Sequence, residues 1–229
     1  MNIKIHHFIK GAQNANGLTV IIDVFRAFSI ACYVYNNGTE KIIPVGDLET
    51  AYRLKKENPH FILMGEREGK KQPGFEYGNS PSEIESIDFS GKTVVQTTSA
   101  GTQGLVNARK ADEIINGSFV NAGAIAEYIR RQQPETVSLV AMGKSGVEKA
   151  MEDTLCAKYI KSVLEEQPMD FTKIHRQLFA YESGREFFDP SCPWKPKGDF
   201  ELCLSLDRFK FILKVEKLDE ELIHFKKIV

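Results

Sequence analysis

The stretch that decides the fold is LTVIIDVFRAFS, at residues 18–29. Its first five residues form an almost unbroken apolar run, which is typical of a strand buried on both faces of a helix-covered sheet. The run ends at Asp23, and Arg26 follows it closely. Open α/β sheets bind ligands at the carboxyl ends of such strands, so the two charges are candidates to bind a metal and an anion. The alternative is that Asp23 caps the next helix and Arg26 pairs with it.

Around this stretch, the first third of the chain alternates strand and helix patterns, which predicts a three-layer α/β/α sandwich. Residues 11–17 predict a polar turn, and residues 65–79 predict a long irregular loop of a kind that is often functional. Residues 183–197 are rich in Gly, Pro and charge and predict a surface loop. A final strand pair is expected at residues 209–215 and 223–229, and the C-terminal third of the chain is expected to wrap or extend the sheet. We expect a single domain over residues 1–229.

Composition limits the classes of partner. The 229 residues carry a net charge of −1, which gives a nucleic-acid partner no electrostatic support. No apolar run approaches membrane-spanning length, and the first residues lack a signal-peptide core. We therefore expect a cytoplasmic protein with no membrane or nucleic-acid partner. The four cysteines form no CxxC pair, which argues against a zinc site and a disulfide framework.

Polar groups of a similar kind follow four of the predicted strands. They are Asp23 and Arg26, then Glu66 and Arg67, then the turn TTSAGT at residues 97–102, and finally the loop at residues 143–146 with Glu152 and Asp153 beyond it. If the four strands are parallel, all four loops lie at one edge of the sheet. That edge then gathers carboxylates, two arginines and a hydroxyl-rich helix start.

The turn at residues 97–102 can cradle an anion. Thr97, Thr98, Ser99 and Thr102 supply hydroxyls, a helix start supplies free N–H groups, and Gly101 allows a close approach of the backbone. The alternative is a helix that caps itself without a ligand, because Ser and Thr commonly cap helices. The turn is not a P-loop, because no Gly-Lys-Ser/Thr is present.

Four carboxylates are hard oxygen ligands of the type that magnesium prefers: Asp23, Glu66, Glu152 and Asp153. For each of them alone, a surface charge or a helix cap is the favoured interpretation, and Glu152 and Asp153 also suit the first turn of a helix, so the metal prediction depends on their convergence. Arg26 and Arg67 are candidates for planar, bidentate recognition of phosphate, sulfonate or carboxylate. The alternative for each arginine is an ion pair with a neighbouring carboxylate.

Several long strings are idiosyncratic: IIDVFRAFS, LMGEREGKKQPGFEYGNSP, GKTVVQTTSAGTQG, MEDTLCAKYI and GDFELCLSLDRF. In this order, and over nearly the whole chain, they resemble the ComB family of 2-phosphosulfolactate phosphatases. The resemblance implies a three-layer α/β/α fold with a mixed, largely parallel sheet. It also implies a magnesium-dependent acid phosphatase that hydrolyses 2-phospho-3-sulfolactate to 3-sulfolactate and phosphate, in methanogens a step toward coenzyme M.

This resemblance suggests roles for the candidate residues. We expect Asp23, Glu66 and either Glu152 or Asp153 to hold Mg²⁺, directly or through water, so that the ion polarises the phosphoryl group and activates an attacking water. Donors of the turn at residues 97–102 hold phosphoryl oxygens, while Arg26 and Arg67 bind the sulfonate and carboxylate. The expected catalytic residues are Asp23, Arg26, Glu152 and Asp153. A rival mechanism makes Asp23 a nucleophile that forms an aspartyl-phosphate.

Two other functions stay open. One is a phosphatase of another small 2-phospho acid, and the other is a non-catalytic anion-binding module. A simple anion binder gains nothing from the carboxylates without a metal, which favours an enzyme acting on a small anionic phosphorylated substrate. Residues 183–197 are candidates for a lid or a dimer contact, so a homodimer stays open.

Overall fold

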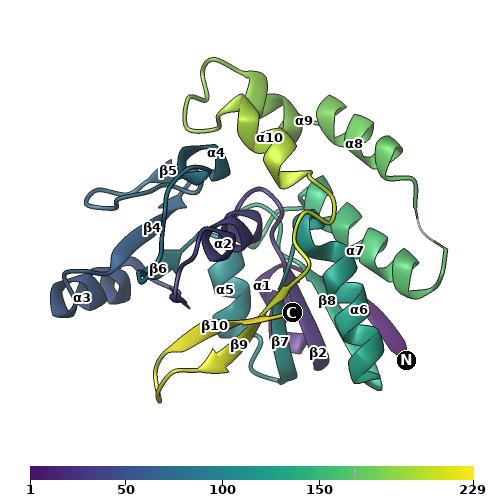
Figure 1. Cartoon of the computed structure of the whole chain (residues 1–229). Helices are drawn as coiled ribbons and strands as arrows, with labels where there is room; N and C mark the ends of the chain where they lie inside the picture. The colour runs from purple at the N-terminus through teal and green to yellow at the C-terminus, as the bar shows by residue number, and fades with distance from the viewer. Residues whose placement is uncertain (168) are drawn as a thin grey trace.

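The computed structural model describes residues 1–167 and 169–229 and has one ten-stranded sheet with helices on both faces (Figure 1). The predicted α/β class with a mixed, mostly parallel sheet is confirmed. The strands are β1 Asn2–His7, β2 Gly17–Ile22, β3 Lys41–Pro44, β4 Ile62–Arg67, β5 Lys70–Lys71, β6 Thr93–Thr97, β7 Ala111–Gly117, β8 Thr136–Ala141, β9 Ile212–Lys217 and β10 Ile223–Ile228. The helices are α1 Phe8–Asn14, α2 Ala27–Asn36, α3 Leu48–Glu57, α4 Pro81–Ile84, α5 Gly101–Asn107, α6 Ala122–Gln132, α7 Met151–Leu164, α8 Phe171–Ala180, α9 Glu182–Arg185 and α10 Lys197–Cys203, with 3₁₀ turns η1 Phe119–Asn121 and η2 Glu186–Phe188.

The sheet consists of two parallel halves joined by the C-terminal hairpin. Its order is β1-β8-β2-β7-β9-β10-β3-β6-β4-β5, with β9 antiparallel to β7 and β10 antiparallel to β3. The expected final strand pair is present, but it fills the centre of the sheet, so this part of the C-terminal third neither wraps the sheet nor extends its edge. The residues of β9 explain this position: Ile212 and Leu213 are both buried and belong to cores on opposite faces of the sheet.

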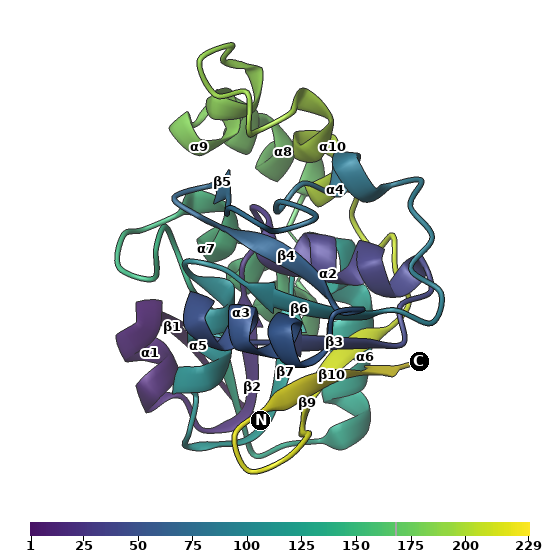
Figure 2. The ribbon, with the colours of Figure 1, turned by 90° about the vertical axis from the view of Figure 1, so that its left-hand side faces the viewer.

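The two parallel halves run in opposite senses across the hairpin, so the condition that all four loop-bearing strands are parallel is not met. Five strand-to-strand steps separate β2 from β6. At about 20–25° of twist per step, the strands turn by roughly 100–125° over this distance. Figure 2 shows the result, with β3 and β6 running across the direction of β2. The twist therefore brings the carboxyl ends of both halves toward each other.

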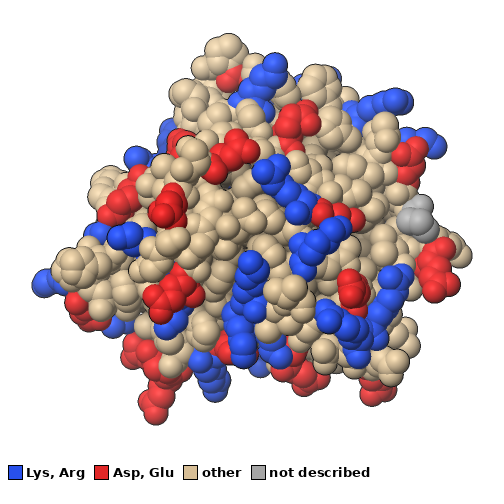
Figure 3. Space-filling view, viewed as in Figure 1, with Lys and Arg blue, Asp and Glu red and all other residues tan. Residues whose placement is uncertain are grey.

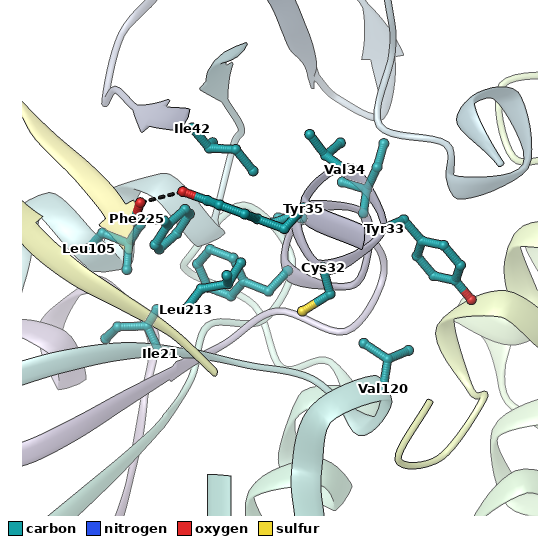
Figure 4. Close-up of a cluster of buried hydrophobic side chains, with 14 of the residues drawn as sticks. Ile21, Cys32, Tyr33, Val34, Tyr35, Ile42, Leu105, Val120, Leu213 and Phe225 are labelled. Carbon is teal, nitrogen blue, oxygen red and sulfur yellow. Dashed lines mark hydrogen bonds between the residues drawn. The ribbon is translucent and has the colours of Figure 1, made fainter. Parts of the chain in front are cut away.

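Helix α2 lies between the two halves. Every residue from Ala27 to Tyr35 is buried, which is the pattern of a helix surrounded by protein on all sides. Figure 4 shows side chains of α2 packed against both halves and the hairpin, with the Tyr35 hydroxyl donating to the Phe225 carbonyl. The Tyr33 hydroxyl donates to the Leu202 carbonyl at 2.9 Å. These contacts hold the last turn of α2 in place, while the buried start of the helix follows directly on Asp23 and Arg26.

The remaining helices cover the sheet as the alternation of strand residues requires. Ile21 faces the core that contains α2 and α5, whereas Val20 and Ile22 face the core that contains α6 and α7. Helix α3 covers the outer face of β3, β6 and β4. Fully burying one such side chain contributes about 1.5–3 kcal/mol, so this alternation fixes which face each strand presents.

Three local predictions are corrected. Residues 65–79 begin with a hairpin, since β4 continues to Arg67 and pairs with β5. Residues 8–14, in part predicted as a turn, form α1. Residues 183–197 include parts of α9 and η2 and lie above the strand ends at the top of Figure 1, rather than forming only a surface loop.

The surface bears charges of both signs. Figure 3 shows acidic and basic side chains interspersed over one face, with neither sign forming a continuous field. Among the described residues, no helix combines the length and the apolar character that crossing a membrane demands.

Candidate active site

A cavity of about 530 Å³ lies where the carboxyl ends of the two sheet halves meet. Its volume lies in the usual range for small-molecule sites. Segments from β2–α2, β4–β5, β6–α5, β8–α7 and residues 181–195 line it. The acidic lining residues are Asp23, Glu66, Glu68, Glu148, Glu152, Asp153, Glu182 and Glu186, and the basic ones are Arg26, Lys144, Lys149 and Lys195.

Asp23 lies at the centre of this cavity, directly after β2. Its Oδ1 accepts a hydrogen bond from the Ala27 N–H at 3.2 Å, so the capping alternative holds for one oxygen. Burial, followed by the charges of Glu66 and Glu152, raises the pKa of Asp23 to about 7. A Cβ on Gly101 would lie 3.0 Å from Asp23 Oδ2, so glycine is needed there to leave room for the carboxylate.

Glu152 and Asp153 project from the first turn of α7 into the same cavity. Asp153 accepts hydrogen bonds from the Val24 N–H and the Gly143 N–H, both at 2.8 Å, which ties the end of β2 to the β8–α7 loop. Glu152 accepts one from the Ser183 hydroxyl at 2.8 Å. Burial raises the pKa of both carboxyls, and the charges of Asp23 and Glu152 raise that of Asp153 further.

Glu66 joins the other half of the sheet to this cluster. Its Oε1 accepts from the Ser99 N–H and its Oε2 from the Gly69 N–H, both at 2.7 Å, and the Ser99 hydroxyl adds a third bond at 3.1 Å. The predicted convergence of Asp23, Glu66, Glu152 and Asp153 is present, since all four line one cavity.

The threonines at positions 98 and 102 of the turn at residues 97–102 form hydrogen bonds within the turn itself. Thr98 Oγ1 accepts from the Thr102 N–H at 3.1 Å, and Thr102 Oγ1 accepts from the Thr98 N–H at 2.9 Å. Thr97 Oγ1 accepts from Arg67 at 2.8 Å. Of the five predicted binding residues in this turn, only Ser99 lines the cavity, and its donors bind Glu66. The geometry favours the self-capping alternative, and the anion cradle stays a prediction.

The two arginines differ in position. Arg26 lines the cavity but forms a buried ion pair with Asp199, at 2.7 Å, and donates to the carbonyls of Trp194 and Gly69 at 2.8 and 3.3 Å. Arg67 does not line the cavity. It donates to the Glu66 and Gly46 carbonyls and to Thr97, and burial lowers its pKa. The predicted substrate contacts of both arginines therefore lack support from this geometry.

Sequence reasoning missed several residues of the site, foremost Asp199, Ser183, Trp194 and Lys195. Asp199 accepts from Arg26 and also from Ser80 and Ser82, so one carboxylate joins α10, the start of α4 and the cavity. The one available signal for it was the string GDFELCLSLDRF, which begins beside it. The other three lie in the predicted surface loop, where no local pattern marks them.

The carboxylates of the cavity suit a magnesium ion that takes one or two of them as direct ligands. No three His, Cys, Asp or Glu side chains of residues 1–167 and 169–229 are gathered closely enough to hold a metal by themselves. Magnesium, however, usually takes one or two protein carboxylates and fills its other positions with water and substrate oxygens. Within the described part of the chain, neither Asp23 nor Asp153 has a basic ion-pair partner, and like charges raise the pKa of each. A divalent cation would relieve that repulsion, whereas a cage of three direct carboxylates has no support.

The fold and the site together define an α/β protein with an acidic, ligand-sized pocket at its strand ends. A sequence model of the family described as 2-phosphosulpholactate phosphatase matches residues 4–217. The chain belongs to this family.

Curated relatives agree with that assignment. A protein of Thermotoga petrophila is 40% identical over 202 residues, which cover 84% of this chain and 86% of the relative. A protein of Clostridium tetani is 32% identical over 193 residues, with 82% of each chain covered. A Thermoplasma acidophilum protein is 32% identical over 195 residues, covering 85% and 84%. Each of the three is named a probable 2-phosphosulfolactate phosphatase.

Proposed function

We propose that this protein is a magnesium-dependent phosphatase that hydrolyses 2-phospho-3-sulfolactate to 3-sulfolactate and phosphate. The observation that carries the proposal is the convergence of four buried carboxylates from both halves of the sheet in one cavity. The names of the relatives supply the substrate.

The charge of the cavity supports a metal-assisted reaction over simple anion binding. Acidic side chains outnumber basic ones two to one in its lining. A substrate with a phosphate, a carboxylate and a sulfonate would meet strong repulsion there unless cations intervene. A non-catalytic anion-binding module has no use for this arrangement.

The chain's own residues position the reaction. When bound, magnesium would polarise the phosphoryl group and lower the pKa of a water. Asp153 accepts hydrogen bonds from two backbone N–H groups and Asp23 from that of Ala27, and these bonds hold both carboxylates in place. Residues of the segment 181–195 line one side of the cavity. Phosphate-monoester hydrolysis has a loose transition state, for which positioning and charge neutralisation supply most of the catalysis.

The test is phosphate release from 2-phospho-3-sulfolactate, 2-phospholactate and 2-phosphoglycolate, each with magnesium and with chelator. We expect magnesium-dependent release that favours the sulfonated substrate. Equal release from all three would leave a phosphatase of small 2-phospho acids, and no release from a folded protein would favour the anion-binding module.

The rival covalent mechanism has its own test. If Asp23 is the nucleophile, rapid acid quenching during turnover will trap labelled phosphate on the protein; a metal-activated water leaves none. We further propose a cytoplasmic location, where the four free cysteines would stay reduced.

A further inference from the structure

Recognition of the substrate's second and third anionic groups needs cations that are free to bind them. Neither arginine meets this need, since Arg26 is paired with Asp199 and Arg67 lies outside the cavity. Of the three lysines in the lining, Lys195 pairs with Glu186, and its charge offsets only part of the rise that burial causes in the pKa of Glu152. Lys144 and Lys149 make no ion pair with any residue that the structure describes, and both are exposed at the edge of the cavity.

The loop that carries these two lysines has a fixed shape. The Lys144 N–H donates to the Glu148 carbonyl at 2.9 Å, and the Glu148 N–H donates to the Lys144 carbonyl at 3.1 Å. Gly143 has a φ of +71°, and a Cβ there would lie 2.0 Å from the Glu148 carbonyl oxygen, so this turn requires glycine. Because the Gly143 N–H also donates to Asp153, the backbone of the loop is held close to the buried carboxylates, and the two lysines extend from it.

We infer that Lys144 and Lys149 bind the sulfonate of the substrate, the anionic group that does not react, and so determine specificity. This inference rests on the proposed function, which places the phosphoryl group at the buried carboxylates. The opposite end of the substrate then lies toward the cavity edge, where the two ammonium groups are. A sulfonate stays fully ionised at all physiological pH values and suits compact ammonium charges that need no bidentate geometry. The acidic neighbour on the same turn, Glu148, lies between the two lysines in sequence and repels any anion that they do not neutralise.

The kinetic test compares 2-phospho-3-sulfolactate with 2-phospholactate, which lacks only the sulfonate. We expect the variants Lys144→Gln and Lys149→Gln each to lower kcat/KM for the sulfonated substrate about tenfold more than for 2-phospholactate, as befits one charge-assisted contact. The double variant should lose most of the discrimination between the two substrates. The matched control is Lys158→Gln, an exposed lysine of α7 outside the cavity, which should leave the ratio as it is in the unmodified protein.

A binding test separates this inference from the proposed function. The chain has a single tryptophan, Trp194, and it lines the cavity, so its fluorescence reports binding without turnover. We expect 3-sulfolactate to bind more tightly than lactate, and the double variant to remove that preference, even if no phosphate ester is hydrolysed. The assignment would be overturned by any of three results. These are an equal loss of kcat/KM for both substrates, a kcat/KM ratio of the two substrates that does not change in the double variant, and equal binding of 3-sulfolactate and lactate.

Discussion

The buried ion pair between Arg26 and Asp199 allows a quantitative prediction. The two side chains are 3% and 0% exposed, and their atoms Nη1 and Oδ2 lie 2.7 Å apart. The variant Asp199→Asn removes the negative charge but keeps the shape, so it leaves the Arg26 guanidinium buried without a counter-charge. Breaking a buried pair in this way costs about 3–5 kcal/mol of unfolding free energy. For a chain of this size, that loss lowers the Tm by roughly 6–20 °C.

The assay is urea unfolding, followed both by Trp194 fluorescence and by circular dichroism. The matched control is Glu165→Gln, which removes the exposed pair between Lys161 and Glu165 and should cost less than about 1 kcal/mol. In the double variant Arg26→Gln/Asp199→Asn, the loss should be smaller than the sum of the two single losses, because no charge is left unpaired. The reasoning would be refuted if Asp199→Asn lost less than about 1 kcal/mol of unfolding free energy, or if the loss in the double variant equalled the sum of the losses in the two single variants.

Two further predictions concern Asp23. In Gly101→Ala, the new methyl group would lie 2.9 Å from Ala27 Cβ and 3.0 Å from Asp23 Oδ2. We therefore expect at least a tenfold lower kcat with little change in circular dichroism. The control is Gly78→Ala, in which the new Cβ would make only ordinary contacts. The pKa of Asp23 is about 7 in the folded chain against 3.8 as its ordinary value, so in the metal-free protein the contribution of Asp23 to stability is largest at low pH. Its unfolding free energy should fall by up to about 4 kcal/mol as the pH rises from about 4 to about 7, and magnesium should restore it; a flat or rising curve in chelator would contradict this.

The sequence predicted what depends on neighbours along the chain. The buried run of β2 ends at Asp23 as expected. Two helix starts have equally local causes, and in the first of them Asp47 caps α3 by accepting from the Thr50 N–H. Ser80 likewise caps α4 ahead of Pro81. These features follow from periodicity and cap chemistry within a few residues.

What the sequence could not predict depends on pairs that are far apart in the chain. Asp199 lies 173 residues from Arg26, and Ser183 lies 31 residues from Glu152. The central position of β9 and β10 also depends on pairing with strands formed much earlier in the chain. The threonines of the turn at residues 97–102 were open between two interpretations, and hydrogen bonds between Thr98 and Thr102 favour self-capping.

The most direct test of the account is the effect of Asp23 on magnesium binding and on turnover. We would titrate magnesium calorimetrically into the unmodified protein and into Asp23→Asn, and measure phosphate release from 2-phospho-3-sulfolactate at each magnesium concentration. The control is Asp112→Asn, an exposed residue near the amino end of β7. We expect saturable magnesium binding that parallels activation in the unmodified protein. Turnover should fall at least a hundredfold in Asp23→Asn and stay unchanged in Asp112→Asn. Turnover that survives chelation, or full magnesium-dependent activity in Asp23→Asn, would contradict it.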